Sequence, residues 1–581
     1  MIRKILLIVL PLTVLACGGL KDQLLLDGDY FPWETENNSS NSGNGEASTV
    51  VVDTHNPEDS LATVSFDRTI AITFSTTGSA TVSGDAHGVV SVSGNGVTVN
   101  NTSYDEKVRY ELSGTTTDGF FKLYSTNKQA VVLKGVNITN RSGAPINIQS
   151  HKRTFIVVDG NTTLTDGASY SGTPSGEDEK AAVFGEGQLI FSGSGSLTVT
   201  ATGGAGITSD DYLRFMAGPA IRVSSSAGHG LRGKDAVIVS DGSLDITVSA
   251  AGKKGISSDG AVTFDGGQTK ISVSGGVDSS DSSDLSGSAG IKTNSTFTIN
   301  DGSLTITNSG QGGKGMSVDL QGFFYGGTVR VDVSGSNYGS SSSGGGPGGF
   351  PGGWGYSSSS DNSVAAKGLK FDGNLVFAGS TVTVTAKNHE AIESKGTLDI
   401  KDGVVYAQSY DDAINAGSHL TISGGLVCAL STGNDGLDAN GNMYIKGGVV
   451  YSVAKGSPEV ALDANTERGY KLYFSGGTLF ALGGLEGGSQ LTQTCYSASW
   501  NKNTWYAMTV GDSTYAFKTP SSGGSGLVVS GATKPELITG ATLSGGEAIF
   551  EGVGLLSPTI SGGSAVSLSS YTSSGGRPGG W

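Results

Sequence analysis

One pattern repeats through the stretch from Ala391 to Asn465. Its successive lines read A-I-E-S-K-G-T-L-D-I-K-D-G-V-V-Y-A-Q-S from Ala391, A-I-N-A-G-S-H-L-T-I-S-G-G-L-V-C-A-L-S from Ala413, G-L-D-A-N-G-N-M-Y-I-K-G-G-V-V-Y-S-V-A from Gly436 and A-L-D-A-N-T from Ala461. Each of the first three lines contains three short runs of alternating apolar residues, with a glycine turn before the third, and the fourth line repeats the first run. Such runs cannot bury one face alone, but stacked copies can, which is the principle of a solenoid.

The repeat length of 22 to 25 residues suits one coil of a parallel β-helix with three short strands. Like residues then lie above one another, about 4.8 Å apart. We therefore expect Ile392, Ile414, Leu437 and Leu462 to form one inward stack. The same place is taken upstream by Ile207, Leu231, Ile256, Ile291, Met316 and Leu369.

Composition supports an all-β chain in one elongated domain. The 581 residues include 94 glycines, only 15% are charged, and no long segment has the helical period. The formal charge of −16 argues against a nucleic-acid partner and fits either a soluble surface or a cation binder. We expect a monomer.

The first residues indicate export. Arg3 and Lys4 precede an apolar run from Ile5 to Leu15 that is too short for a usual membrane span. The end of this run, V-L-A-C, resembles a bacterial lipobox, which implies cleavage before Cys17 and lipid attachment to it. We expect a protein anchored by lipid in the cell envelope, at the outer membrane or cell surface. The alternative is an ordinary secretory signal with a stray cysteine.

Changes in composition divide the chain. We expect a lipoprotein signal peptide at 1–17, a flexible tether at 18–48, an N-terminal β region at 49–128, a β-helix at 129–484 with a Gly/Ser-rich insertion at 334–360, a C-terminal β cap at 485–569 and a disordered tail at 570–581. The insertion carries Tyr338, Phe350, Trp354 and Tyr356, and is either a disordered connection or a mobile aromatic flap. We expect Cys428 and Cys495 to be free thiols.

Several pieces together resemble one family. They are L-K-G-V-N-I-T-N-R-S-G-A-P-I from Leu133, G-N-T-T-L-T-D-G from Gly160, A-A-V-F from Ala181, G-H-G-L-R-G-K-D from Gly228 and Y-D-D-A-I-N-A-G from Tyr410. Over about 130 to 480 the chain is similar to bacterial carbohydrate-binding β-helix proteins first described from a cellulolytic clostridium. The resemblance implies a right-handed, pectate-lyase-like β-helix that binds calcium and plant-type or acidic polysaccharide without known catalysis.

Carboxylates recur at two outward places in the later copies. The residue after the inward aliphatic and the residue two before it, together with Asp411 beside Asp412, give the candidate metal ligands. They are Glu390, Glu393, Asp411, Asp412, Asp435, Asp438 and Asp463. Stacked carboxylates repel one another, and a hard cation that takes six to eight oxygens relieves this repulsion. The column is either a calcium site or a solvated acidic stripe. Upstream copies carry Lys253, Lys254 and Lys314 where the family commonly has aspartate, so calcium is not expected there.

Aromatic residues gather on the outward faces of the C-terminal copies. The third strands give Tyr406, Tyr451 and Phe480, and the middle strands give Tyr444 and Tyr473. Rigid rings suit the apolar faces of sugars, so these five are the candidate carbohydrate-binding residues. The alternatives are that aromatic residues simply favour strands, or that the C-terminal segment covers them.

The sequence offers little for catalysis, and no catalytic residue is assigned. The expected function is non-catalytic polysaccharide binding. A lyase acting on uronic-acid polymers is the first alternative, because Lys367, Lys370 and Lys395 lie close in sequence to the carboxylates. A surface adhesin or scaffold is the second alternative.

Overall fold

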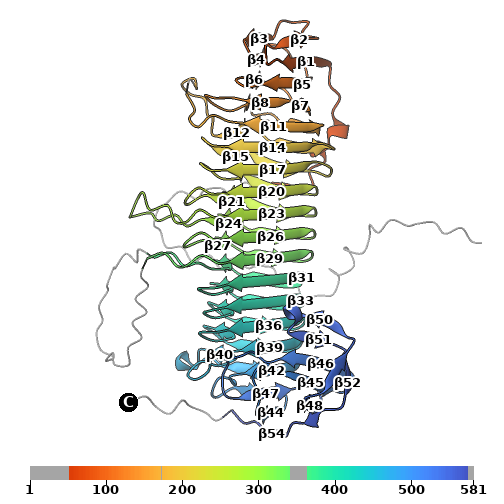
Figure 1. The fold of residues 1–581 in the computed structure, drawn as a ribbon, viewed down its shortest axis with the longest axis vertical. Helices are drawn as coiled ribbons and strands as arrows, with labels where there is room; N and C mark the ends of the chain where they lie inside the picture. Colours follow the sequence, from red (N-terminus) through yellow and green to blue (C-terminus); the bar gives the residue numbers. More distant parts are fainter. Residues whose placement is uncertain (1–51, 172, 340–362, 574–581) are drawn as a thin grey trace, which may run out of the picture. The chain divides into compact units, whose positions relative to one another are not determined.

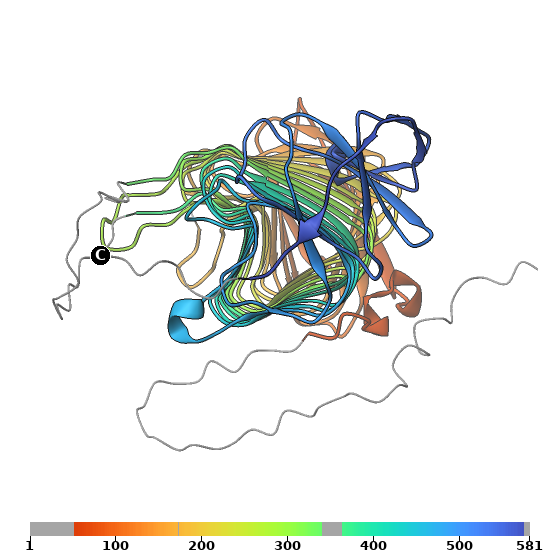
Figure 2. The same cartoon turned by 90° about the horizontal axis from the view of Figure 1, so that it is seen from below.

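Short strands with period 2, separated by tight turns, wind into a parallel β-helix (Figure 1). The computed structural model describes residues 52–171, 173–339 and 363–573. Each coil contributes one strand to each of three ladders, which Figure 2 shows in a view along the stack. The predicted all-β solenoid is confirmed, with about 15 turns and additional sheets at its ends.

The first ladder starts with an antiparallel pair, β3 and β4, and is parallel from β4 onward. Its strands are β3 (Val90–Ser93), β4 (Gly96–Asn101), β6 (Phe120–Ser125), β9 (Ile146–Gln149), β12 (Ala181–Gly185), β15 (Ala205–Ser209), β18 (Leu231–Gly233), β21 (Lys254–Ser258), β24 (Ala289–Thr293), β27 (Lys314–Val318), β30 (Leu369–Phe371), β32 (Ile392–Ser394), β34 (Ile414–Ala416), β37 (Leu437–Ala439) and β40 (Leu462–Ala464). Coiling therefore begins upstream of residue 129.

The second and third ladders belong to one continuous sheet, because β5, β31 and β33 are long enough to join both. The second contains β1 (Arg68–Phe74), β5 (Val108–Thr116), β7 (Gln129–Lys134), β10 (Thr154–Asp159), β13 (Leu189–Gly193), β16 (Tyr212–Phe215), β19 (Ala236–Val239), β22 (Ala261–Phe264), β25 (Phe297–Ile299), β28 (Gly322–Phe324), β31 (Leu375–Ala386), β33 (Leu398–Ser409), β35 (Leu420–Ile422), β38 (Met443–Ile445), β41 (Leu472–Phe474) and β43 (Gln490–Leu491). The third continues through β8 (Asn137–Thr139), β11 (Asn161–Thr165), β14 (Ser196–Ala201), β17 (Ala220–Ser225), β20 (Ser243–Val248), β23 (Gln268–Val273), β26 (Ser303–Asn308), β29 (Thr328–Val333), β36 (Leu426–Ser431), β39 (Val449–Val453) and β42 (Thr478–Leu482).

The inward residues of all three ladders form one core. The register places Ile392, Ile414, Leu437 and Leu462 directly above one another, and all four are fully buried. This confirms the predicted stack. The third ladder requires glycine at its entrance: Gly448 has φ of 79°, and a Cβ there would lie 2.7 Å from the carbonyl oxygen of Gly424 in the preceding coil.

The C-terminal segment closes the stack and folds back along its side. Strands β44 (Cys495–Ala498) and β47 (Leu527–Ser530) pair antiparallel with each other, and β47 also pairs with β42. A six-stranded sheet follows, built from β45 (Trp505–Val510), β46 (Ser513–Lys518), β48 (Glu536–Thr539), β50 (Glu547–Ile549), β51 (Gly554–Leu556) and β53 (Ser564–Ala565). Smaller elements are β2 (Thr81–Ser83), β49 (Thr542–Ser544), β52 (Thr559–Ser561), β54 (Ser569–Ser570), η3 (Thr466–Arg468) and η4 (Phe550–Gly552).

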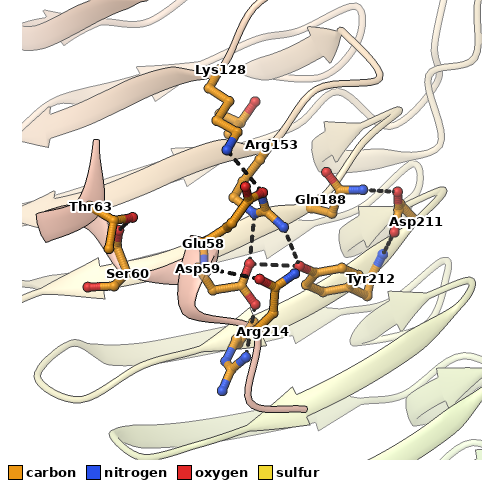
Figure 3. A network of polar contacts seen from close by, with 12 residues as sticks. Glu58, Asp59, Ser60, Thr63, Lys128, Arg153, Gln188, Asp211, Tyr212 and Arg214 are labelled. Carbon is orange, nitrogen blue, oxygen red and sulfur yellow. Dashed lines mark hydrogen bonds and ion pairs between the residues drawn. The ribbon is translucent and has the colours of Figure 1, made fainter. Parts of the chain in front are cut away.

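Residues 52–66 form a strap across the outside of the second ladder. The strap contains η1 (Pro57–Asp59) and η2 (Leu61–Thr63), and its apolar residues pack on an outward cluster that includes Phe155 and Ile190. Asp59 lies at its centre, where its carboxylate accepts hydrogen bonds from Arg153, Tyr212 and Arg214 at 2.7 to 2.9 Å (Figure 3). The strap thus covers an apolar stripe that would otherwise face water.

Several predicted features lie outside the described residues. They are the signal peptide with Cys17, the tether, and Phe350, Trp354 and Tyr356 of the insertion. No helix in the described ranges is long and apolar enough to cross a membrane. Cys428 and Cys495 are free thiols, as expected, and both are buried.

Candidate functional site

The acidic column lies on the outward face of the last four strands of the first ladder. Because the inward aliphatics stack, the residue after each one points to the opposite face, and the register gives Glu393, Asn415, Asp438 and Asp463 on consecutive coils. A second row, Glu390, Asp412 and Asp435, lies in the turns just before these strands and is at most 7% exposed. The predicted column is therefore more buried than a solvated stripe would be.

Amides and backbone groups hold the carboxylates in place. Asn415 Nδ2 donates to Asp412 at 3.0 Å and to Asp438 at 2.9 Å, so a single amide bridges two coils. Asp412 also accepts from the backbone nitrogen of Asp435 at 3.1 Å. These contacts order the carboxylates without neutralising them.

Four of the carboxylates have no cationic partner among the ion pairs of the described residues: Asp412, Asp435, Asp438 and Asp463. Burial, followed by Asp438 as the nearest charge, raises the pKa of Asp412 to about 8. Burial is also the main cause that raises the pKa of Asp435 to about 7 and of Asp438 to about 6. Burial and a hydrogen bond with Glu486 raise the pKa of Asp463 to about 9. An added cation would reverse these shifts, so the donor set fits a hard metal ion.

The upstream end of the column is different because Lys367 neutralises it. Lys367 Nζ lies 3.3 Å from Glu390 and 2.7 Å from Glu393. Burial alone would raise the pKa of Glu390. His389 and Lys367 outweigh this effect and hold that pKa below its ordinary value. His389, Glu390 and Asp411 each bring one potential ligand atom within 4.8 Å of the others. His389 carries no signal in the repeat and was not predicted.

The structure corrects the predicted aromatic surface of the third ladder. Tyr406, Tyr451 and Phe480 are 5%, 1% and 0% exposed, since the C-terminal sheet packs over them with Tyr506 and Phe517. Tyr451 Oη donates to the backbone oxygen of Lys518 at 2.7 Å. These three residues point outward from the coil as predicted, but they form a second core and offer no sugar surface.

The two tyrosines of the second ladder remain accessible. Tyr444 and Tyr473 stack with ring centroids 5.1 Å apart and planes 11° from parallel, and Tyr473 is exposed. Lys446 Nζ lies 5.3 Å from the centroid of Tyr444. His419 meets Tyr444 and the exposed Tyr470 edge-on, at 6.3 and 6.1 Å. We call Tyr444, Tyr470, Tyr473 and His419 the tyrosine platform.

A pocket of about 370 Å³ lies beside the platform at Tyr470. Tyr470 and Lys471 line one part of it, and Glu486, whose carboxylate contacts Asp463, lines another. The pocket exists because η3 lengthens the turn between β40 and β41. Sequence reasoning missed Tyr470 and Glu486, because they lie in connections that depart from the repeat.

Comparison with known proteins places the chain in a family. Residues 93–413 and 353–479 match the family described as carbohydrate-binding domain-containing protein. A protein of that description from Acetivibrio thermocellus is 35% identical over 115 residues, which are 19% of this chain and 40% of the relative. The match thus spans less than half of that relative's length.

One solved structure is also similar to this chain. It is described as the polysaccharide lyase-like protein from C. thermocellum, in a gadolinium derivative, and is 25% identical with a TM-score of 0.36, covering 45% of this chain and 96% of its own. The family match covers more than half of the present sequence. The chain therefore belongs to the carbohydrate-binding domain-containing protein family.

Proposed function

We propose that this protein binds polysaccharide, without cleaving it, on the surface formed by the tyrosine platform, the adjoining pocket and the acidic column. The observation that carries this proposal is the stacked, accessible pair Tyr444 and Tyr473 beside a pocket with carboxylate and amine groups. Flat rings receive the C–H faces of sugars at low entropic cost, while nearby polar groups hydrogen-bond to the hydroxyls.

Calcium fits the unpaired carboxylates of the same surface. Asp412, Asp435, Asp438 and Asp463 would hold it, and the bound ion would supply the positive charge that these buried carboxylates lack. Asn415 now presents its NH₂ group to Asp412 and Asp438. The opposite amide orientation would present its carbonyl oxygen as a further ligand.

The lysines considered for a lyase all lie beside carboxylates. Burial alone would lower the pKa of Lys367, but Glu390 and Glu393 hold that pKa above its ordinary value. The amine of Lys367 therefore stays protonated. Lys370 Nζ lies 2.7 Å from Asp372, and Lys395 Nζ lies 3.7 Å from the same residue. A general base must be unprotonated, which favours binding over elimination.

The direct test is the affinity for soluble plant polysaccharides, measured by calorimetry with and without calcium. Losing one stacked ring should cost about 1 kcal/mol, so Tyr444→Ala and Tyr473→Ala should each weaken binding several-fold. Tyr325→Ala is the matched control, because Tyr325 is 50% exposed and follows β28 in the same ladder, away from the platform. Unchanged affinity in the double variant Tyr444→Ala/Tyr473→Ala would remove the platform from the proposal.

Cleavage has its own test on uronic-acid polymers, because elimination leaves an unsaturated product that absorbs ultraviolet light. We expect no such product. Its formation by the wild-type chain, and its loss in Lys367→Met, would establish the lyase instead.

The proposed place of action is the cell envelope, with Cys17 as the lipid attachment residue. Metabolic labelling with a radioactive fatty acid in a bacterial host should mark the wild-type chain and leave Cys17→Ser unlabelled. Equal labelling of both chains would exclude this anchor.

A further inference from the structure

The turn position that carries carboxylates in the last coils carries amines in the preceding ones. The register of the first ladder aligns the positions two residues before each inward aliphatic. On successive coils these positions hold Lys254, Ala289, Lys314, Lys367 and then Glu390. The change of sign occurs at Lys367, which pairs with the glutamates of the next coil. The face is thus divided into a basic part and an acidic part.

Some lysines on the basic part have a carboxylate partner. Lys292 pairs with Asp319 and Lys370 pairs with Asp372, both within the same face. Lys254 and Lys314, like Lys253 beside them in the sequence pattern, form no ion pair among the described residues. Both are half-buried, and a charge withdrawn from water requires a counter-charge or a full set of hydrogen bonds.

The two ammonium groups flank one short segment of backbone. Lys254 Nζ donates to the backbone oxygen of Gly252 and, at 2.8 Å, to Ser286 Oγ. Lys314 Nζ lies next to the following residue, Gly287, where an added Cβ would be 3.6 Å from it. No hydrogen bond of Lys314 Nζ occurs within the described ranges. The coil between the two lysines carries Ala289 at the same position, so no long side chain fills the column there.

Burial and neighbouring lysines act on the pKa of both amines in the same direction. Burial first, and then neighbouring lysines, lower the pKa of Lys254 and of Lys314 to about 8 each. The charges that face Lys254 are Lys253, Lys292, Asp278 and Asp284, and those that face Lys314 are Lys254, Lys367, Lys370 and Glu393. A bound anion would relieve the repulsion and complete the missing hydrogen bonds.

We propose that Lys254 and Lys314, with Ser286 between them, form an oxyanion-binding site that receives a carboxylate or sulfate group. On an acidic glycan this group would anchor the chain upstream of the tyrosine platform, and that extension rests on the proposed function. The site itself depends only on the two amines, Ser286 and the gap at Ala289.

Calorimetric titration of the full chain with sodium sulfate and with glucuronate, at constant ionic strength and pH 7, tests the site. Glucose is the matched neutral ligand for glucuronate. We expect both anions to bind the wild-type chain, and Lys314→Met to weaken both at least tenfold. Met is similar in length and removes a half-buried charge, so the variant should fold. Lys254→Met gives a second, independent measurement with the same expected loss.

Lys292→Met is the control variant, because Lys292 is on the same face but already paired with Asp319. It should bind the anions like wild type. Binding of both anions supports a general oxyanion site, and binding of glucuronate alone narrows it to carboxylates. Equal anion affinity of wild type, Lys314→Met and Lys254→Met, or equal response to glucose and glucuronate, would overturn the proposal.

Anion binding at the two lysines can be tested independently of polysaccharide binding at the tyrosine platform. The double variant Tyr444→Ala/Tyr473→Ala should keep its anion affinity, because neither tyrosine contacts the lysines. Conversely, Lys314→Met should keep its affinity for neutral polysaccharide.

Discussion

Tyr451 and Tyr473 illustrate how two outward residues on neighbouring strands acquire different roles. Tyr451 contacts Phe480 and Phe517 and is 1% exposed, whereas Tyr473 stacks on Tyr444 and remains in contact with solvent. The first therefore contributes to folding, and the second is available to a ligand.

Tyr451→Ala should destabilise the chain strongly, because it leaves a cavity between the third ladder and the C-terminal sheet. Truncation of a large buried aromatic typically costs about 3–5 kcal/mol. Denaturant unfolding followed by circular dichroism measures this. Tyr473→Ala, the exposed counterpart, should shift the midpoint very little. Similar unfolding midpoints of the two variants would show that the sheet does not depend on Tyr451.

At the scale of elements, the carboxylates on β37 and β40 and in the turns before β34 and β37 should make stability depend on both pH and calcium. A carboxylate whose pKa is higher in the folded chain than in the unfolded chain stabilises the fold below its ordinary pKa, and this is lost as pH rises through the folded value. With Asp438, Asp435, Asp412 and Asp463 raised from 3.8 to between about 6 and about 9, chelated protein should lose stability from about pH 4 to about pH 9.

If calcium occupies the proposed site, it should restore the stability lost near neutral pH, because a ligand that binds only the folded chain stabilises that chain. At a concentration 100 times its dissociation constant, such a ligand contributes about 2.7 kcal/mol. Thermal melting in chelator and in calcium measures the difference. Asp412→Asn combined with Asp435→Asn should abolish the calcium effect and raise the melting temperature in chelator. Identical melting of wild type with and without calcium at pH 7.5 would refute a calcium site.

The strap is an element whose stability depends on a single carboxylate. Asp59 is 1% exposed, and its carboxylate forms ion pairs with both Arg153 and Arg214. Asp59→Ala leaves the buried guanidinium group of Arg214 without its carboxylate and leaves Arg153 with the exposed Glu58 alone. Breaking a buried ion pair in this way typically costs about 3–5 kcal/mol. Limited proteolysis should then cleave residues 52–66 first. Glu58→Ala is the control, because Glu58 is exposed and should be nearly neutral. Equal protease resistance of both variants would contradict a strap held by Asp59.

At the scale of the whole molecule, we expect the C-terminal segment to keep the chain from aggregating. It covers the aromatic residues of the third ladder and pairs with the last strand of that ladder. A chain that ends after Gly484 would expose both an apolar patch and an open strand edge, each of which promotes association. We expect this truncated chain to aggregate in size-exclusion chromatography. A soluble monomer at the same concentration would show that the cap is dispensable.

The stacking of coils could be predicted from the sequence because it depends on local rules. Alternation fixes which residues of a strand share a face, and the repeat length places equivalent residues above one another. Ile392, Ile414, Leu437 and Leu462 follow directly, and so does the alignment of Glu393 with Asp438 and Asp463 on one face. The reversal from Lys314 and Lys367 to Glu390 is likewise visible in the sequence once the register is known.

The exposure of an outward residue was decided only by the tertiary structure. Alternation sends Tyr406, Tyr451 and Tyr473 outward alike, but it contains no information on what another part of the chain lays over each face. The covering sheet comes from residues 505–565, and nothing in the repeat specifies where that sheet docks. The pocket between Tyr470 and Glu486 also arises where a turn departs from the repeat. Local periodicity therefore determined the direction of each side chain, and long-range burial determined whether that side chain serves the core or the surface.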